Sequence, residues 1–496
     1  MSDLDIQHID SVHIKIRCER SIAKELSDFF TFTVPNYQYT PAYKNKIWDG
    51  QIRLYSVHTQ LLYSGLLDYV YKFAKERNYT VGTDIEKPQI TIPHKDVNSY
   101  ILDKIRPTVN GKEIQPHEHQ IDAITHAINK ERCLLLSPTG SGKSLIIYSL
   151  VRYYESILPK DKKILIIVPT TGLVSQMYND FKDYSSKNKW NVDNKCHVIY
   201  AGQDKVTEKK VVISTWQSLY KMSEKYFSQY GAIFGDECHL FKSKSLTTLM
   251  TKLKDCKYRI GTTGTLDGTH THKLVVEGLF GGVHNVTTTT KLMEKDLLSK
   301  LEIDCINLQY PMKDIESIKR ATYQDEIKWI ITHEKRNEFI TSLCSSMKGN
   351  TLLLFNFVEH HGKPLFNRIR SECGDRKVFF IHGGTDTEQR EYIRKIIDKE
   401  KNAILIASYG TCSTGINIKN IHNIIFSSPS KSVVRVLQSI GRGLRKSNDK
   451  DHVKLYDISD NLNFKKYKNH TMRHFDERIK IYNRENFVFN VLKIKL

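Results

Sequence analysis

Eight short apolar runs occur along the 496-residue chain, and segments with helical spacing separate most of them. A continuous apolar run of this length is typical of a strand buried on both faces. Such strands, alternating with helices, predict parallel sheets with helices packed on both sides, so an α/β fold is expected. The runs are residues 133–137, 164–169, 211–215, 232–236, 351–357, 378–383, 403–408 and 423–428.

The runs form two groups of four, which predicts two α/β domains in tandem. The residues between the groups are more polar and have mainly helical spacing. The domains expected are residues 1–110, a small α/β N-terminal domain, residues 111–285, the first large domain, residues 286–345, a junction and the start of the second, and residues 346–496, the second large domain with a C-terminal extension.

The first 110 residues have shorter patterns of both kinds. Residues 11–18 alternate like a half-buried strand, and residues 21–30 have helical spacing. Residues 36–56 are predicted to form a hairpin that turns at Asp49-Gly50.

The chain is basic: 75 Lys and Arg against 55 Asp and Glu give a formal net charge of +20. A chain this basic often binds nucleic acid, although a charge surplus that only aids solubility is nearly as common. No apolar run approaches the ~20 residues of a membrane span, so no membrane partner is expected. The nine cysteines include no CxxC pair, and the first residues carry no secretory signal, which together predict a cytoplasmic protein.

A glycine-rich segment, SPTGSGKS, directly follows the first apolar run. It departs from the phosphate-loop pattern GxxxxGK[ST] only in its first residue, a serine. A tight turn between a strand and a helix points backbone N–H groups at phosphates. Lys143 is expected to reach the β- and γ-phosphates of ATP, and Ser144 to bind Mg2+. The predicted ATP-binding residues of this loop are Ser137, Pro138, Thr139, Gly140, Ser141, Gly142, Lys143 and Ser144.

Two carboxylates, Asp236 and Glu237, end the fourth apolar run in the segment DECH. An acidic pair after a strand is usually a solvated loop, but beside a phosphate loop it matches a Walker B element. Asp236 is expected to hold Mg2+ through water, and Glu237 to activate the attacking water.

The segment QSIGRGLR, in the second large domain, contains Gln438, Arg442 and Arg445. The two arginines are three residues apart, so on a helix they share a face. Aimed across a cleft at ATP, they would stabilise the charge that develops on the γ-phosphate. Taken alone, the pair would be read as a basic helix face exposed to solvent.

These three segments stand in the order of motifs I, II and VI of superfamily-two helicases and translocases, which the chain resembles over about residues 115–450. The resemblance implies two RecA-like P-loop domains and an ATP hydrolase. It also implies that Gln120, in PHEHQIDAI, reads adenine, and that Thr263-Gly264-Thr265 is motif III. DECH is neither DEAD nor the common DEAH, and Asn417 replaces the aspartate of many relatives.

Three further segments resemble motifs Ia, Ib and V: VPTTGLVSQ, ISTWQSL and YGTCSTGINI. The resemblance implies a nucleotide contact by Gly415 in motif V. The nucleic-acid contacts that it implies are Pro169, Thr170, Thr171, Thr215 and Thr414.

Over its whole length the chain resembles more closely the UvsW family of T-even phage helicases. The shared segments include WDGQIRL, IIVPTT, DECHL and the run from Leu437 to Lys446. This resemblance implies an ATP-dependent DNA helicase that remodels branched DNA by branch migration and by unwinding forks and R-loops, which contain RNA–DNA hybrids. It implies a monomeric motor for phage recombination, repair and replication control, in the cytoplasm of the infected bacterial host.

The residues themselves leave alternatives open. One is an RNA helicase with the same motor, and another is a nucleotide switch that binds nucleic acid without translocation. Two paired α/β domains speak against a switch, because a single-domain switch needs no second domain. Four aromatic residues within the predicted hairpin, with Lys44 and Lys46 among them, suit either a nucleic-acid surface or a small core. These aromatic residues are Tyr37, Tyr39, Tyr43 and Trp48.

Overall fold

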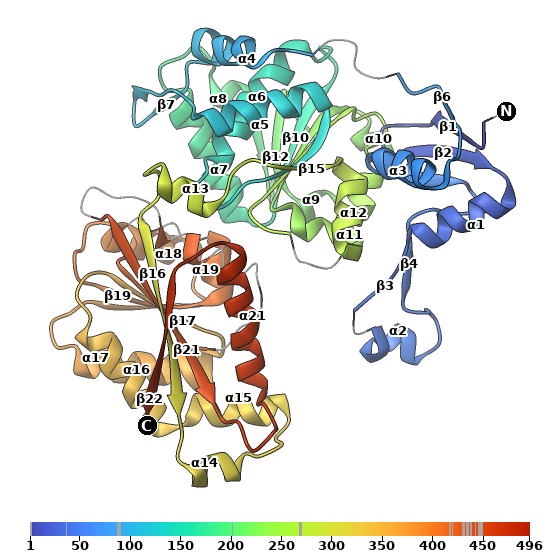
Figure 1. The fold of residues 1–496 in the computed structure, drawn as a ribbon. Coiled ribbons are helices and arrows are strands. Elements are labelled where there is room, and N and C mark those ends of the chain that lie inside the picture. The colour runs from blue at the N-terminus through green and yellow to red at the C-terminus, as the bar shows by residue number, and fades with distance from the viewer. Residues whose placement is uncertain are drawn as a thin grey trace. The chain divides into compact units, whose positions relative to one another are not determined.

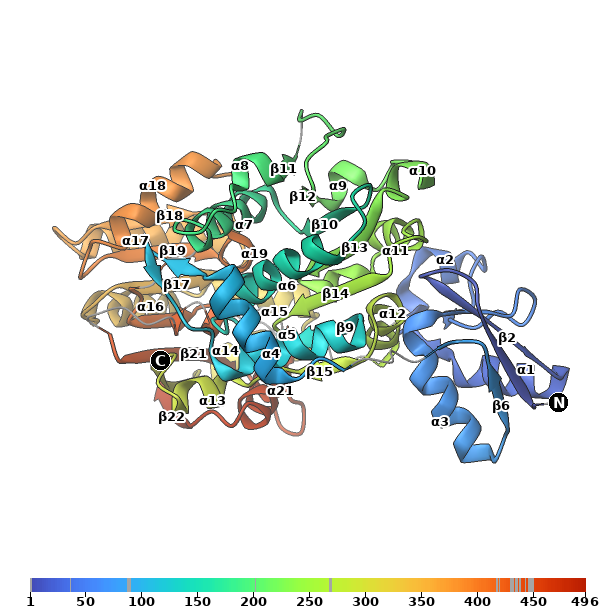
Figure 2. The ribbon, with the colours of Figure 1, turned by 90° about the horizontal axis from the view of Figure 1, so that it is seen from above.

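The chain divides into two compact units in a computed structural model (Figures 1 and 2). The first unit consists of Met1–Ser137 and Gly142–Val286, and the second of Pro138–Ser141 and Thr287–Leu496. The structure describes residues 2–35, 37–86, 91–200, 202–266, 270–415, 418, 420–428, 432, 436, 439–441, 443–444 and 450–496.

A sheet of seven described strands, all parallel, forms the centre of the first unit. Its strands, in spatial order, are β11 (Cys196–Ile199), β12 (Val211–Thr215), β10 (Lys163–Val168), β13 (Tyr230–Asp236), β14 (Tyr258–Thr263), β9 (Arg132–Leu136) and β15 (Val283–Asn285). The strand before the phosphate loop, β9, therefore neighbours β14, and β14 neighbours β13, which ends in Asp236. Because the strands are parallel, their carboxyl ends lie at one edge of the sheet.

Helices cover both faces of this sheet. Cys133 and Leu135 of β9 belong to the core on one face, and Leu134 belongs to the core on the other. Helices of the first face are α4 (His94–Tyr100), α5 (Glu118–Lys130), α6 (Lys143–Ile157), α7 (Thr171–Tyr184) and α8 (Val192–Lys195). Those of the second face are α9 (Trp216–Leu219), α10 (Glu224–Phe227), α11 (Lys244–Thr251) and α12 (His270–Phe280).

A smaller mixed sheet forms near the N-terminus, as expected for a small α/β region. Helices α1 (Arg20–Phe29) and α3 (Leu67–Arg77) pack on it, and its core includes Ile6, Leu26 and Phe73. The strand predicted over residues 11–18 and the helix predicted over residues 21–30 are confirmed. The strand order is β5 (Leu61–Tyr63), β2 (His13–Cys18), β1 (Leu4–His8) and β6 (Val81–Thr83).

The hairpin predicted over residues 36–56 is wrong at its turn. β3 (Thr31–Thr33) does pair with β4 (Gln51–Arg53), but two helical turns lie between them, η1 (Tyr37–Tyr39) and α2 (Pro41–Lys44). Thr40 caps α2 by accepting a hydrogen bond from the Tyr43 N–H at 3.4 Å. A capping threonine before a proline starts a helix, and this local signal prevails over the Asp-Gly turn.

A second sheet of seven described strands, again all parallel, forms the centre of the second unit. In spatial order they are β18 (Val378–Ile381), β19 (Ile404–Ser408), β17 (Thr351–Phe355), β20 (Asn423–Phe426), β21 (His452–Asn461), β16 (Lys300–Gln309) and β22 (Phe489–Lys495). Its described helices are α13 (Thr289–Glu294), α14 (Met312–Ser317), α15 (Tyr323–Thr332), α16 (Glu334–Ser346), α17 (Lys363–Glu372), α18 (Thr387–Ile397), α19 (Tyr409–Gly415) and α21 (His470–Arg484).

Two buried ion pairs attach helices to this second sheet. Arg336 of α16 binds Asp460 of β21 at 2.7 Å, and Arg478 of α21 binds Asp457 of the same strand at 2.8 Å. Tyr310 also donates its hydroxyl to Asp460 at 2.7 Å. Burying a charge is costly unless it is paired, so each arginine fixes its helix over one aspartate.

All eight predicted strands are present, and the α/β fold with two parallel sheets is confirmed. Six strands of the two large sheets were not predicted: β11, β14, β15, β16, β21 and β22. β16 lies in the region predicted as a junction, and it pairs with both β21 and β22. The domain boundaries at residues 110, 285 and 345 stay predictions.

Among the helices of the described residues, none has the length and apolar character needed to cross a membrane.

Candidate nucleotide-binding site

The predicted phosphate loop connects β9 to α6. Ser137 is buried, and its N–H donates to the carbonyl oxygen of Thr263 at 2.9 Å, which fixes the start of the loop to β14. Gly140 and Gly142 have φ angles of +87° and +84°, in the left-handed region that favours glycine. The ammonium group of Lys143 donates to the carbonyl oxygen of Ser137 at 3.1 Å. The lysine is therefore folded back over its own loop.

Gln120, predicted to read adenine, lies against the same loop. It is buried on α5, and its Oε1 accepts a hydrogen bond from the N–H of His117 at 2.9 Å. A Cβ atom at Gly142 would lie only 2.1 Å from Nε2 of Gln120. The backbone angle favours glycine at position 142, and a side chain there would also displace the Gln120 amide.

Asp236 lies at the end of β13. Its Oδ1 accepts the hydroxyl of Thr262 at 2.9 Å and the N–H of Glu237 at 3.0 Å. Burial and the neighbouring Glu237 carboxylate raise the pKa of Asp236, while the charge of Lys143 and the Thr262 hydrogen bond act against that rise. Lys143 is therefore close enough to Asp236 for the two predicted residues to belong to one site.

Glu237 has a φ of +52°, which is uncommon for a residue with a side chain. Its Oε2 lies 3.3 Å from Nδ1 of His239, and the same nitrogen lies 3.0 Å from the hydroxyl oxygen of Thr263. The hydroxyl of Thr263 in turn donates to the carbonyl oxygen of Thr265 at 2.9 Å. The acidic segment and the segment that resembles motif III are thus joined by hydrogen bonds.

The residues at this site fit a magnesium-bound nucleoside triphosphate. The N-terminus of α6, a helix of 15 residues, suits phosphate because its backbone N–H groups carry partial positive charge. The hydroxyl of Ser144 and the carboxylate of Asp236 are the hard oxygen ligands that Mg2+ prefers. The hydroxyl of Ser144 lies 2.8 Å from that of Tyr184 on α7.

The remaining loop residues connect Ser137 to Gly142. Ser141 is buried, and its hydroxyl and its N–H both donate to the carbonyl oxygen of Pro138, at 2.7 and 3.3 Å. This bonding closes a tight turn around Thr139 and Gly140.

The nucleic-acid contacts predicted in the first unit follow two neighbouring strands. Pro169 and Thr170 follow β10, and Thr215 ends β12, where it pairs in register with Val168. Thr170 caps α7 by accepting from the N–H of Leu173 at 3.4 Å. Thr215 is buried with its hydroxyl 3.0 Å from that of Ser218, whereas Thr171 is exposed.

The predicted residues of the second unit are only partly described. Thr414 and Gly415 lie in the last turn of α19. Gln438, Arg442 and Arg445 lie outside the described residues, as does Asn417.

Two residues at the site were missed by the sequence reasoning. Thr262 belongs to the segment GTTGTL that resembles motif III, but no role is predicted for it there, and its contact with Asp236 depends on β13 and β14 being neighbours. Tyr184 is 40 residues from Ser144 along the chain, and no local pattern points to their contact.

Three families match successive parts of the chain. The family described as "DNA helicase UvsW, N-terminal" matches residues 3–84, and "Type III restriction enzyme, res subunit" matches residues 113–268. The "Helicase conserved C-terminal domain" family matches residues 334–447.

Individual relatives agree with these families. The chain is 35% identical to the ATP-dependent DNA helicase uvsW of Enterobacteria phage T4, with 100% of both chains covered. The crystal structure of T4 UvsW is 32% identical over 99% of both chains, with a TM-score of 0.53. The DEAD-box helicase Mss116 bound to ssRNA is 16% identical and has a TM-score of 0.55 over 83% of this chain and 81% of that one, a likeness of fold alone.

Proposed function

Because this chain belongs to the UvsW family of ATP-dependent DNA helicases, we propose that it couples ATP hydrolysis to the remodelling of branched DNA. The proposed reactions are branch migration and the unwinding of forks and R-loops, in phage recombination, repair and replication control. We propose that it acts as a monomer in the cytoplasm of the infected bacterium. The observation that best supports an ATP-driven motor is the order of the neighbouring strands β9, β14 and β13. The phosphate loop follows the carboxyl end of β9, and the acidic pair lies at the carboxyl end of β13.

The phosphate loop is proposed to bind the phosphates of ATP. The backbone N–H groups of the loop and of the first turn of α6 would donate to phosphate oxygens. Lys143 would exchange its bond to the Ser137 carbonyl for a bond to the β- and γ-phosphates. Gln120 would hydrogen-bond adenine from its place beside Gly142.

Ser144 and Asp236 are proposed to hold Mg2+, Asp236 through water. The bound metal supplies positive charge that neutralises the phosphate oxygens. Glu237 would orient the attacking water and accept its proton. The nearby ring of His239, with its Nδ1 3.3 Å from Oε2 of Glu237, supports this role because it limits the orientations open to the carboxylate.

Nucleic acid is proposed to bind along the edge formed by the ends of β10 and β12. Contacts would go to the sugar-phosphate backbone, so sequence preference should be slight and binding should weaken steeply with salt. The proposed contact residues are Pro169, Thr170, Thr171, Thr215 and Thr414.

Four residues of the segments that resemble motifs V and VI are proposed to complete ATP binding and hydrolysis. They are Gly415, Gln438, Arg442 and Arg445. Arg442→Ala should then lower turnover far more than nucleotide affinity, since arginine fingers contribute roughly 10³–10⁵ in rate. Lysine at position 442 should rescue poorly, because an ammonium group lacks the planar fork of a guanidinium.

The test is a comparison of ATP hydrolysis and strand separation on matched forks, duplexes, single strands and RNA. We expect forked DNA to stimulate hydrolysis most and to be unwound, and Lys143→Ala to abolish both activities while the protein stays folded. Greater stimulation and unwinding with RNA would instead support an RNA helicase. Stimulated hydrolysis with no movement or strand separation on any substrate would support a nucleotide switch.

A further inference from the structure

Residues 37–49, carried by the ribbon of β3 and β4, form a segment that we call the arm tip (Figure 1). All of these residues are described, and none of them is buried. Tyr39 is 76% exposed, and Ile47 is 79% exposed. The aromatic residues here therefore do not form a buried core.

The rings at the arm tip are held in place by their neighbours. Tyr37 and Tyr43 pack edge to face, with their centroids 4.6 Å apart. A Cβ atom at Gly50 would lie 2.2 Å from the Tyr37 ring, so the backbone itself packs against that ring. The indole N–H of Trp48 donates to the carbonyl oxygen of Gln51 at 2.7 Å. Rings fixed in this way lose little conformational entropy when a ligand binds.

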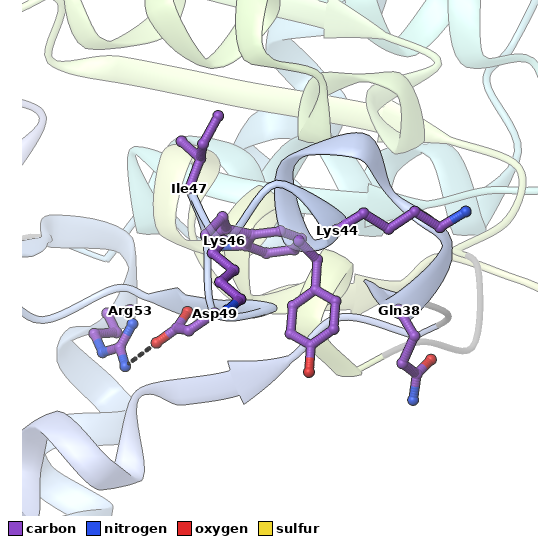
Figure 3. Close-up of a pocket in the computed structure, with 8 residues that line it drawn as sticks. Gln38, Lys44, Lys46, Ile47, Asp49 and Arg53 are labelled. Carbon is purple, nitrogen blue, oxygen red and sulfur yellow. Dashed lines mark hydrogen bonds and ion pairs between the residues drawn. The ribbon is translucent and has the colours of Figure 1, made fainter.

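An open hollow of about 780 Å³ lies at the arm tip (Figure 3). Figure 3 shows Lys44 and Gln38 on one side of it and Asp49 and Arg53 on the other. The hollow combines aromatic and apolar surface with cationic groups. The residues that supply these are Tyr43, Trp48, Ile47, Lys44, Lys46 and Arg53.

The positive charge at the hollow is only partly neutralised. Arg53 pairs with Asp49 at 2.6 Å. Within the part of the chain that the structure describes, Lys44 and Lys46 have no carboxylate partner. Exposed rings next to unpaired lysines are the combination that binds single-stranded nucleic acid, with bases stacking on the rings and phosphates meeting the cations.

We propose that the arm tip binds unpaired DNA at a branch point. One base stacks on the aromatic surface of Tyr43 and Trp48, and Lys44 and Lys46 neutralise the adjacent phosphates. This inference rests on the proposed function, because it takes the ligand to be the substrate on which the motor acts. It assigns to the N-terminal region a site that is distinct from the nucleotide site.

The first test measures binding of the full-length protein to a fork with a single-stranded arm and to a blunt duplex. Tyr43→Ala should weaken fork binding roughly 5- to 150-fold, the range that one stacked base contributes. Tyr43→Phe, which keeps the ring, should bind like the parent. Blunt-duplex binding and the ATPase rate without DNA should not change in either variant, which also shows that the variants are folded.

The second test measures the slope of log K against log salt for the fork. Replacing Lys44 and Lys46 by alanine should reduce that slope by about 1.4, because each phosphate contact on a single strand contributes about 0.7. The matched control replaces Lys24 and Lys75, exposed lysines on α1 and α3, and should leave the slope unchanged. An equal loss of slope in the control would overturn the inference, since general charge would then explain the effect.

A cross-linking experiment locates the contact directly. 5-Iodouracil in the single-stranded arm should cross-link to the peptide that contains Tyr43 and Trp48. If the parent unwinds forks but the arm-tip variants bind and unwind them equally well, the arm tip is not a DNA site, and a protein partner becomes the better occupant. If the parent itself shows no fork-stimulated ATPase, the proposed function fails instead.

Discussion

The hydroxyl of Thr262 donates to Oδ1 of Asp236 at 2.9 Å, across the boundary between β14 and β13. Burial and Glu237 raise the pKa of Asp236, and this hydrogen bond opposes them by stabilising the ionised carboxylate. Asp236 has to be ionised for the metal-binding role proposed for it. Thr262 is therefore a positioning residue that keeps a raised pKa from rising further.

Replacing Thr262 should shift the pH dependence of the ATPase. Thr262→Val keeps the shape of the side chain but removes the donor, so the pKa of Asp236 should rise. The acidic limb of the DNA-stimulated rate should then move to higher pH, with the plateau above it much less affected. Thr262→Ser, which keeps the hydroxyl, is the control and should retain the parental profile. An unchanged acidic limb in Thr262→Val would show that Asp236 does not limit the rate there.

Asp236→Asn should separate stability from activity. The pKa of Asp236 is raised in the folded state, so the proton binds more tightly there than in the unfolded chain. Stability gained from that proton is present below the unfolded pKa and is lost as pH rises through the folded pKa. At neutral pH the charged carboxylate therefore costs stability, and a neutral asparagine, whose Oδ1 can still accept both hydrogen bonds, removes the cost.

Thermal unfolding of the ATP-free protein should show this effect. We expect the Tm of Asp236→Asn to match or exceed that of the parent at pH 7.5, and the advantage to shrink at acidic pH. Its ATPase activity should fall to background. A large loss of Tm at neutral pH would contradict the idea that this carboxylate is disfavoured by folding.

Glu237→Gln should retain ATP binding and stall hydrolysis. The amide keeps the size of the side chain but cannot accept a proton from water. The left-handed backbone at position 237 suits glutamine no worse than glutamate, so the fold should persist. Nucleotide affinity can be measured by equilibrium binding and turnover by phosphate release. Parental turnover in this variant would show that another group activates the water.

Much of this fold follows from short-range patterns in the sequence. The eight predicted strands are continuous apolar runs, and β9 is followed by a loop whose glycines have the backbone angles that the motif requires. β14, with the sequence YRIGTT, was missed because polar residues interrupt its apolar character. β16 and β21 were missed for a similar reason, since both contain aspartates that pair with cationic side chains elsewhere in the fold. Asp304 of β16 pairs with Lys454, and Asp457 and Asp460 of β21 pair with Arg478 and Arg336.

The residues of the candidate site likewise fall into those that the sequence predicts and those that it does not. Lys143, Asp236 and Gln120 could be predicted because each belongs to a local motif. Thr262 and Tyr184 could not, because their contacts depend on which strands are neighbours and on how α7 packs. The hairpin turn predicted at Asp49-Gly50 was wrong for a different reason. Its local turn signal was outweighed by another local signal, the cap that Thr40 provides to α2.

Gly65 should be intolerant of any side chain, because its backbone lies directly against the backbone of α12. A Cβ atom there would lie 2.1 Å from the carbonyl oxygen of Glu277 and 2.6 Å from that of Gly278, and helix backbone cannot move aside as a side chain can. Next to this contact, the hydroxyl of Tyr69 donates to Glu277 at 2.7 Å. Gly65→Ala should therefore cost roughly 1–3 kcal/mol, the usual range for overpacking. Chemical denaturation would measure this loss, and hydrogen exchange should show that it is concentrated in residues 61–77 and in α12. Gly282→Ala is the control, since a Cβ atom at that position would have no neighbour within 4 Å. If Gly65→Ala were as stable as this control, residues 64–66 would not be packed directly on α12.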